Sequence, residues 1–260
     1  MVIAEATIMQ FLADYLLAFC RISGMFASMV GLSAKSIPTP IKSLLAVLLT
    51  FMLMPIIPAS PVTDLVSVGS FVEAGKQLMI GIGLGFISTL VLNTFVLAGQ
   101  IVAMQTGLGF ASIVDPVNGI NVPAVGQFYL ILATLLFWTL DGHLAMIQMV
   151  AMSFQAFPVG EGWWQAEQFQ AIAHWAGWMF TSAVIMTLAP IVSLLIVNLA
   201  FGVMTKAAPQ LNIFSIGFSI AQIMGLVIIW ITMANFTNHF EQQWERAQLM
   251  MCQLVRICGV

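Results

Sequence analysis

Asp141 and His143 are the two residues whose types and setting first indicate chemistry. They lie near the middle of an apolar run, Val125–Phe157. A carboxylate and an imidazole at membrane depth are typical of a proton relay. The triplet Asp141-Gly142-His143 also has a structural interpretation, because Gly142 permits a turn and the triplet can mark a helix break or the tip of a hairpin. Residues two apart do not share a helix face, and this spacing favours the structural interpretation.

Asp14 and Arg21 are a second pair of charged residues inside an apolar run, Ile8–Val30. Seven residues apart, they lie near one face of a helix, so they can form an ion pair or each contact polar neighbours. Charge inside a bilayer is expensive and rarely faces lipid, which predicts that both side chains face a protein interior. The alternative is that either side chain reaches a membrane interface from a position near a helix end.

Other catalytic and metal-binding patterns are absent from the sequence. It contains no H-E-x-x-H motif, no Walker loop and no Gly-x-Ser-x-Gly elbow. His143, His174 and His239 lie far apart and have too few acidic or thiol neighbours for a metal site. We therefore expect neither an enzyme nor a cofactor.

The composition places the chain in a membrane. Of its 260 residues, 61% are hydrophobic and 7% are charged, whereas soluble chains carry about 25% charged residues. Membrane lipid is thus an expected partner, and the net charge of -3 gives no electrostatic basis for binding nucleic acid. Cys20, Cys252 and Cys258 are scattered and fit neither a disulfide framework nor a metal cluster, so we interpret them as packing residues.

The elements that must hold these residues are long apolar helices. The pattern predicts an all-α integral membrane protein with about six long apolar helical runs, several of them broken: Ile8–Val30, Ile41–Ile57, Leu78–Ala111, Val125–Phe157, Phe169–Met204 and Ile213–Phe236. The third run would be about 51 Å long if wholly helical, so it must protrude from the bilayer or break. Gly81 and Gly85 form a G-x-x-x-G pair that lets a neighbouring helix come close. The paired Trp163 and Trp164 suit a membrane interface.

The C-terminal segment changes character and predicts a boundary between a membrane-type helical domain, residues 1–237, and an amphipathic helix, residues 238–260. Apolar residues there repeat at helical intervals, at Phe240, Trp244, Ala247, Met251, Leu254 and Cys258. We expect a surface helix that docks on membrane or on a partner.

The stretch Gly99–Gln127 interrupts the apolar pattern between two long runs. It is rich in Gly, Gln, Asn and Pro, and Asp115 is its only charged residue. Irregular chain at membrane depth occurs only where protein buries it or where it lines a watery cavity, because lipid offers the backbone no hydrogen-bond partners. The stretch therefore points to a pore-lining or gate element, although its composition alone favours the alternative, an ordinary loop outside the membrane. Gln100 and Gln105 can hydrogen-bond neighbouring subunits without the cost of burying a full charge.

Three segments together resemble the FliR family of bacterial type III export-gate subunits: GQIVAMQTGLGFASIVDPVNG, FWTLDGH and NLAFGVMTKAAPQLNIFSIGF. The resemblance covers nearly the whole chain, in order and in length. It implies a subunit that joins FliP and FliQ in an assembly of staggered helical hairpins, in the bacterial inner membrane and the flagellar basal body. It further implies a gated passage for unfolded flagellar proteins, with FlhB at the cytoplasmic entrance.

The same resemblance implies that the segment Gly107–Asn121 is a plug loop that closes the passage when it is idle. The residues that would form this plug are Gly107, Gly109, Phe110, Ile113, Asp115, Pro116, Asn118 and Asn121. Small residues, amides and branched apolar side chains, with glycines as hinges, suit a seal that must yield to a passing chain.

Two other functions stay open on the sequence. One is the homologous export subunit of an injectisome, which the wording of the motifs disfavours. The other is an ion-coupled membrane transporter that uses Asp141 and His143, together with Asp14 and Arg21. Such a transporter would work alone in liposomes, whereas a gate subunit should be inert without its partners.

Overall fold

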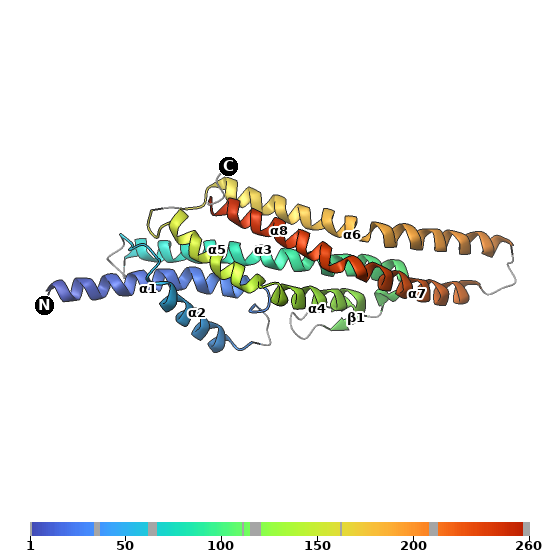
Figure 1. Ribbon diagram of the computed structural model, residues 1–260, viewed down its shortest axis with the longest axis horizontal. Helices are drawn as coiled ribbons and strands as arrows, with labels where there is room; N and C mark the ends of the chain where they lie inside the picture. The colour runs from blue at the N-terminus through green and yellow to red at the C-terminus, as the bar shows by residue number, and fades with distance from the viewer. Residues whose placement is uncertain are drawn as a thin grey trace. The chain divides into compact units, whose positions relative to one another are not determined.

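The computed structural model describes residues 2–33, 37–61, 67–110, 112–114, 121–161, 163–207 and 213–256. In this part of the chain the elements follow the order α1 (Val2–Ser28), α2 (Thr39–Leu53), α3 (Val68–Thr106), η1 (Leu108–Phe110), β1 (Ser112–Val114), β2 (Asn121–Pro123), α4 (Ala124–Thr139), α5 (Gly142–Ala156), α6 (Ala166–Ala207), α7 (Ile213–Thr232), η2 (Met233–Asn235) and α8 (Phe236–Leu254) (Figure 1). Four helical stretches among the described residues are long and apolar enough to cross a membrane, or five if the pair α4 and α5 counts as one span. The predicted all-α membrane fold is confirmed.

The two longest helices, α3 and α6, run without interruption. They contain 39 and 42 residues, which gives lengths of roughly 58 and 63 Å at about 1.5 Å per residue. The third predicted run therefore does not break in its apolar part, and the chain leaves the helix only at Gly107. Pro190 lies inside α6, which continues past it.

The chain forms two compact units. Unit 1 contains Met1–Leu90, Phe137–Trp175 and Trp244–Val260, and unit 2 contains Val91–Leu136 and Ala176–Gln243. Several long helices contribute residues to both units, and each unit is described by itself below. The predicted domain boundary after residue 237 stays a prediction.

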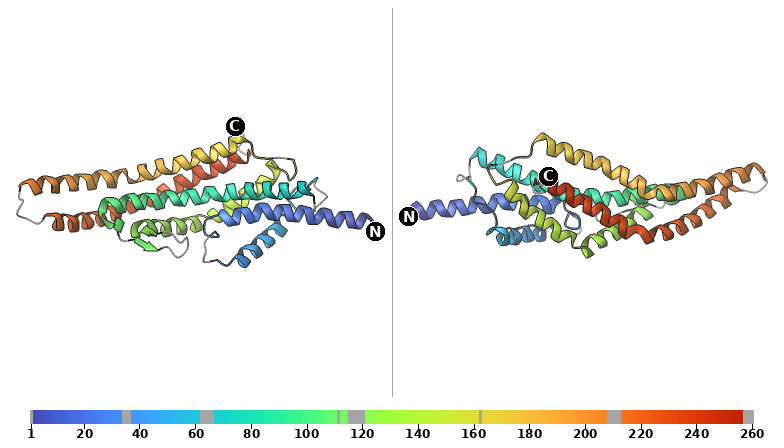
Figure 2. Two further views of the ribbon diagram at one scale, coloured as in Figure 1. Left: turned by 180° about the vertical axis from the view of Figure 1, so that it is seen from behind. Right: turned by 45° about the horizontal axis from the view of Figure 1, so that its top comes forward.

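In unit 1, α1 and the first part of α3 lie side by side (Figure 2), and glycines permit their close approach. A Cβ on Gly81 would lie 1.9 Å from the Arg21 carbonyl oxygen, and a Cβ on Gly85 would lie 2.2 Å from the Ser28 hydroxyl. The Ser28 hydroxyl donates to the Ile82 carbonyl at 2.9 Å. The predicted role of the G-x-x-x-G pair in close helix packing is confirmed.

Unit 1 also contains the break that separates α4 from α5. Asp141 adopts a left-handed backbone with a φ of 54°, and its carbonyl accepts the Leu144 and Ala145 amides at the start of α5. A Cβ on Gly142 would lie 2.5 Å from the Phe137 ring, so a larger residue does not fit there. The interpretation of the Asp141-Gly142-His143 triplet as a helix break is confirmed.

Unit 2 is held by close backbone contact and by aromatic packing. A Cβ on Gly99 of α3 would lie 2.6 Å from the Cα of Gly126 in α4. The Phe95 and Phe236 ring centroids are 5.1 Å apart, and Tyr129 meets Phe236 edge to face at 5.3 Å. Aromatic pairs of this kind contribute about 0.5–1.5 kcal/mol beyond their burial. These contacts position α3, α4 and α8 within the unit.

The predicted C-terminal amphipathic helix is α8, which begins at Phe236. The five described residues of its predicted apolar side are at most 4% exposed: Phe240, Trp244, Ala247, Met251 and Leu254. Cys258 lies outside the described residues. The amphipathic helix is confirmed, but the expectation that this side docks on membrane or on a partner is wrong, because the chain itself covers it.

Trp164 and Cys252 have surroundings that the sequence did not indicate. Trp164 is buried within unit 1: it is 2% exposed, and a Cβ on Gly83 would lie 2.3 Å from its ring. Its position at a membrane interface stays a prediction. Cys252 is disulfide-bonded rather than a free packing residue, whereas Cys20 is free. The wide spacing of the three cysteines in the sequence gave no indication of this disulfide bond.

Candidate functional site

Arg21 lies at the centre of a buried polar network in unit 1. The side chain is 0% exposed. Its Nε donates to Gln77 Oε1 at 2.7 Å, Nη1 donates to Ser153 Oγ at 3.1 Å, and Nη2 donates to the Phe157 carbonyl at 2.7 Å. The guanidinium also lies 4.1 Å from the centre of the Phe154 ring, in the geometry of a cation–π contact. A buried charge is tolerated in this way because each of its three nitrogens has an acceptor.

Glu73 extends this network along α3. Its Oε1 accepts from Gln77 Nε2 at 2.7 Å and from the Gly160 amide at 3.1 Å, and Oε2 pairs with Lys76 Nζ at 3.1 Å. The negative charge of Glu73 also attracts the positively charged guanidinium of Arg21. The network therefore joins α1, α3, α5 and the turn before α6. Sequence reasoning missed Glu73 and Gln77, although their spacing of four residues places both on one face of a helix.

Asp14 and Arg21 are not brought together; each has partners of its own. Asp14 is half-buried, and its Oδ1 accepts from the Ser60 amide at 2.8 Å and from Gln10 Nε2 at 3.5 Å. The sequence left open an ion pair between Asp14 and Arg21 and separate contacts of each to polar neighbours. The structure contains the separate contacts. Arg21 faces the protein interior, and Asp14 does so in part.

Asp141 and His143 lie at the helix break but face different surroundings. Asp141 is exposed, and His143 is half-buried with its ring centroid 4.7 Å from that of Trp138. Within the described part of the chain, His143 Nδ1 is buried without a hydrogen-bond partner. The described residues contain no group of three or more His, Cys, Asp and Glu side chains that could hold a metal ion.

The described residues of Gly99–Gln127 belong to α3 up to Thr106 and to α4 from Ala124 onward. Gly107 has a φ of 76° and follows the last residue of α3. After the short η1 helix, β1 pairs antiparallel with β2, with Ile113 opposite Val122. A Cβ on Gly109 would lie 2.6 Å from Met104 Sδ.

The other predicted gate residues have different positions. Gln100 and Gln105 belong to α3, where Gln100 is half-buried and Gln105 is exposed. Phe110 lies in η1, and Asn121 begins β2. Asp115, Pro116 and Asn118 lie outside the described residues.

Comparison with known proteins supports one family. Residues 12–247 match the family described as bacterial export proteins, family 1. The flagellar biosynthetic protein FliR of Escherichia coli (strain K12) is 33% identical over 228 residues, which cover 86% of this chain and 87% of that protein. FliR of Pectobacterium carotovorum subsp. carotovorum is 33% identical over 220 residues, 85% of this chain and 84% of its own. FliR of Aquifex aeolicus (strain VF5) is 28% identical over 244 residues, 91% of this chain and 93% of its own. The chain therefore belongs to the bacterial export proteins, family 1, the family that includes the flagellar biosynthetic protein FliR.

Proposed function

We propose that this chain is a subunit of the flagellar type III protein export gate. In this role it joins FliP and FliQ subunits to form a passage for unfolded flagellar proteins across the bacterial inner membrane, with FlhB at the cytoplasmic entrance. The flagellar names of its relatives support this role over the homologous subunit of an injectisome. The chain is thus one part of a hetero-oligomer rather than a passage by itself.

The observation that carries this proposal is the length and exposure of α6. Its roughly 63 Å far exceeds a hydrocarbon core of about 30 Å, and even a tilt of about 40° leaves roughly 48 Å along the membrane normal. Large apolar side chains are exposed from Phe169 to Met204, over roughly 52 Å of the helix, and they include Phe180, Val184, Leu188, Leu195, Leu199 and Val203. Lipid can cover only part of this surface, so other protein subunits are needed to cover the rest.

The segment Gly107–Asn121 is the plug of the proposed passage. Two strands of three residues are marginally stable by themselves, and Gly107 supplies a left-handed turn at the end of α3. A closing element that must move aside for a passenger needs such weak internal contacts.

Co-expression with FliP and FliQ subunits, followed by native mass spectrometry, tests the proposed assembly. We expect one hetero-oligomer that contains all three chains and restores motility to a strain that lacks this subunit. A substitution on the exposed side of α6, Leu199→Glu, should prevent assembly, whereas Glu241→Gln on the exposed polar side of α8 should not. A stable monomer that never associates with the other subunits contradicts the proposal.

The plug is tested by shortening it. Deletion of Gly109–Ile113 should let ions and small dyes cross the inner membrane, because the seal depends on filling the passage. Replacement of the same residues by Gly and Ser at equal length is the matched control and should leak less. If the deleted variant assembles and the membrane stays tight, this segment is not the seal.

A further inference from the structure

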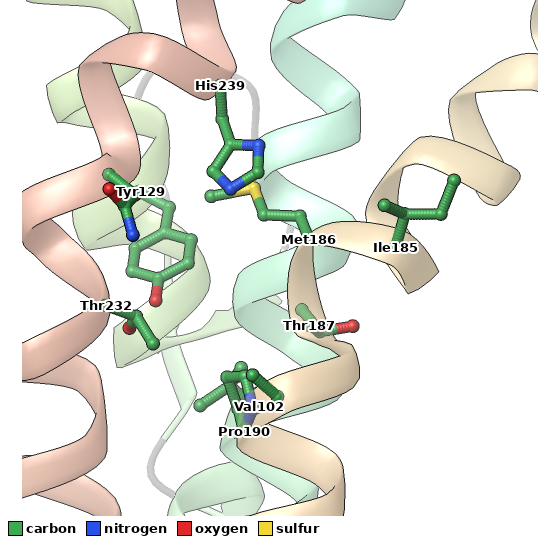
Figure 3. Close-up of a pocket in the computed structure, with 10 residues that line it drawn as sticks. Val102, Tyr129, Ile185, Met186, Thr187, Pro190, Thr232 and His239 are labelled. Carbon is green, nitrogen blue, oxygen red and sulfur yellow. The ribbon is translucent and has the colours of Figure 1, made fainter.

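A pocket of about 150 Å³ lies in unit 2, beside the proline of α6, and it is partly open, because Ile185, Ala189 and Asn235 of its lining are exposed. Residues of α4 and α7 face residues of α6 across it, and the imidazole of α8 lies between them (Figure 3). Its lining includes Tyr129, Met186, Pro190, Thr232, Asn235 and His239. The pocket therefore combines a hydroxyl pair, an amide and an imidazole within a unit that is otherwise mostly apolar.

Tyr129 and Thr232 place hydrogen-bonding capacity at the wall of the pocket. Tyr129 is only 2% exposed, and its hydroxyl points toward the Thr232 side chain (Figure 3). The Thr232 hydroxyl donates its single proton within its own helix, to the carbonyl of Ile228 at 2.9 Å or of Ile229 at 3.0 Å, so toward Tyr129 it can only accept. The Tyr129 oxygen then retains acceptor capacity toward the pocket.

Pro190 creates a second need for a polar partner at the same place. Proline has no N–H group, so the Met186 carbonyl, four residues earlier, cannot receive its regular helical hydrogen bond. Both residues line the pocket. A backbone carbonyl without a donor is costly in apolar surroundings, and the neighbouring Thr187 hydroxyl donates to the Ala183 carbonyl instead.

We propose that this pocket binds a small cluster of ordered water molecules. One water donates to the Met186 carbonyl, and the cluster is held by the Tyr129 hydroxyl, the Asn235 amide and the His239 imidazole. A water molecule occupies about 30 Å³ in the liquid and needs two to four polar partners, and both conditions are met by a pocket of this size and lining. The water completes the hydrogen bonding of α6 at Pro190 and links it to α4, η2 and α8.

The two tyrosines of the chain, Tyr15 and Tyr129, allow a direct test. The full chain in the assembly that it forms is labelled with 3-fluorotyrosine, and the Tyr15→Phe variant identifies the Tyr129 fluorine resonance. We expect that resonance to move between H₂O and D₂O by at least half as much as the resonance of half-buried Tyr15. A Tyr129 resonance that does not move, while that of Tyr15 does, overturns the proposal.

A second measurement uses xenon, which we expect to leave the Tyr129 resonance unchanged. Dry apolar cavities bind xenon, whereas in a polar hydrated pocket xenon would have to displace hydrogen-bonded water. We expect no xenon-dependent shift of the Tyr129 resonance in the natural chain. In Asn235→Leu, which makes the lining more apolar, the solvent isotope shift should fall. Xenon binding in the natural chain shows a dry pocket and overturns the proposal, whether or not the variant folds.

Discussion

Units 1 and 2 of this chain are held together by different kinds of contact. Unit 1 buries Arg21 and Glu73 in a network of directed hydrogen bonds. Unit 2 contains only Asp115, Lys206 and Glu241 of the charged Asp, Glu, Lys and Arg residues. The residues of unit 2 that are buried and carry a polar side-chain group are, within the described part of the chain, Thr94, Thr106, Tyr129, Ser182 and Thr187, and that group is a hydroxyl in each.

This difference indicates that one membrane chain can combine a rigid unit with an adaptable unit. Hydrogen bonds depend on distance and angle, so a satisfied network specifies one arrangement of helices. Apolar contact is non-directional and tolerates repacking. We therefore expect unit 1 to be rigid in itself, and unit 2 to adapt to the surfaces that cover it.

Replacement of Arg21 by Met should have the largest effect on stability. It leaves buried acceptors on Gln77, Ser153 and Phe157 without their donor, at a cost of about 1–3 kcal/mol each, offset in part because no charge is then buried. We expect a net loss of about 3 kcal/mol, measured as a lower melting temperature and a lower yield in detergent. Arg256→Met is the matched control, because the Arg256 side chain is 55% exposed and its ion pair to the exposed Glu167 is 4.0 Å long, and it should change little. Equal behaviour of the two variants would show that the network does not hold unit 1.

Replacement of Gly81 by Ala tests the close crossing of α1 and α3. The new Cβ would lie 1.9 Å from a backbone oxygen, so the helices must move apart at a cost of about 1–3 kcal/mol. Gly75 in the same helix has nothing within 4 Å, and Gly75→Ala should instead stabilise the chain by about 0.5–1 kcal/mol. Thermal unfolding of both variants measures the two stability changes, which should have opposite signs.

The equivalent change in unit 2 should have a smaller effect. A Cβ on Gly99 would lie 2.6 Å from the Gly126 Cα, but apolar neighbours can adjust, and we expect a loss of about 1 kcal/mol. Gly177→Ala is the control within unit 2, since nothing lies within 4 Å of Gly177. A loss as large as that of Gly81→Ala would show that unit 2 is no more adaptable than unit 1.

Replacement of Asp141 by Asn should have the smallest effect. Asn tolerates the left-handed backbone that this position requires, and the residue is exposed. We expect a stability change below about 0.5 kcal/mol, with assembly and motility largely retained. Complete loss of export from an intact assembly would instead favour a proton relay through Asp141 and His143.

Local pattern predicted the helices but not the contacts between distant segments. The repeat of Phe240, Trp244 and Ala247 identified the buried side of α8, and Gly142 marked the helix break, because both signals lie within a few turns of chain. The partners of Arg21 lie 56 and 132 residues away, at Gln77 and Ser153. The periodicity of one segment does not indicate which distant side chains its residues will contact.

Photocrosslinking from the exposed side of α6 tests the central claim most directly, namely that partner subunits cover the apolar surface of unit 2. A photoreactive amino acid replaces Leu199, which is 68% exposed, in cells that produce the whole assembly, and Ala183, fully buried in the same helix, is the control position. We predict adducts with FliP or FliQ subunits from position 199 and adducts only within the chain from position 183. Adducts from position 199 with lipid alone would contradict the claim.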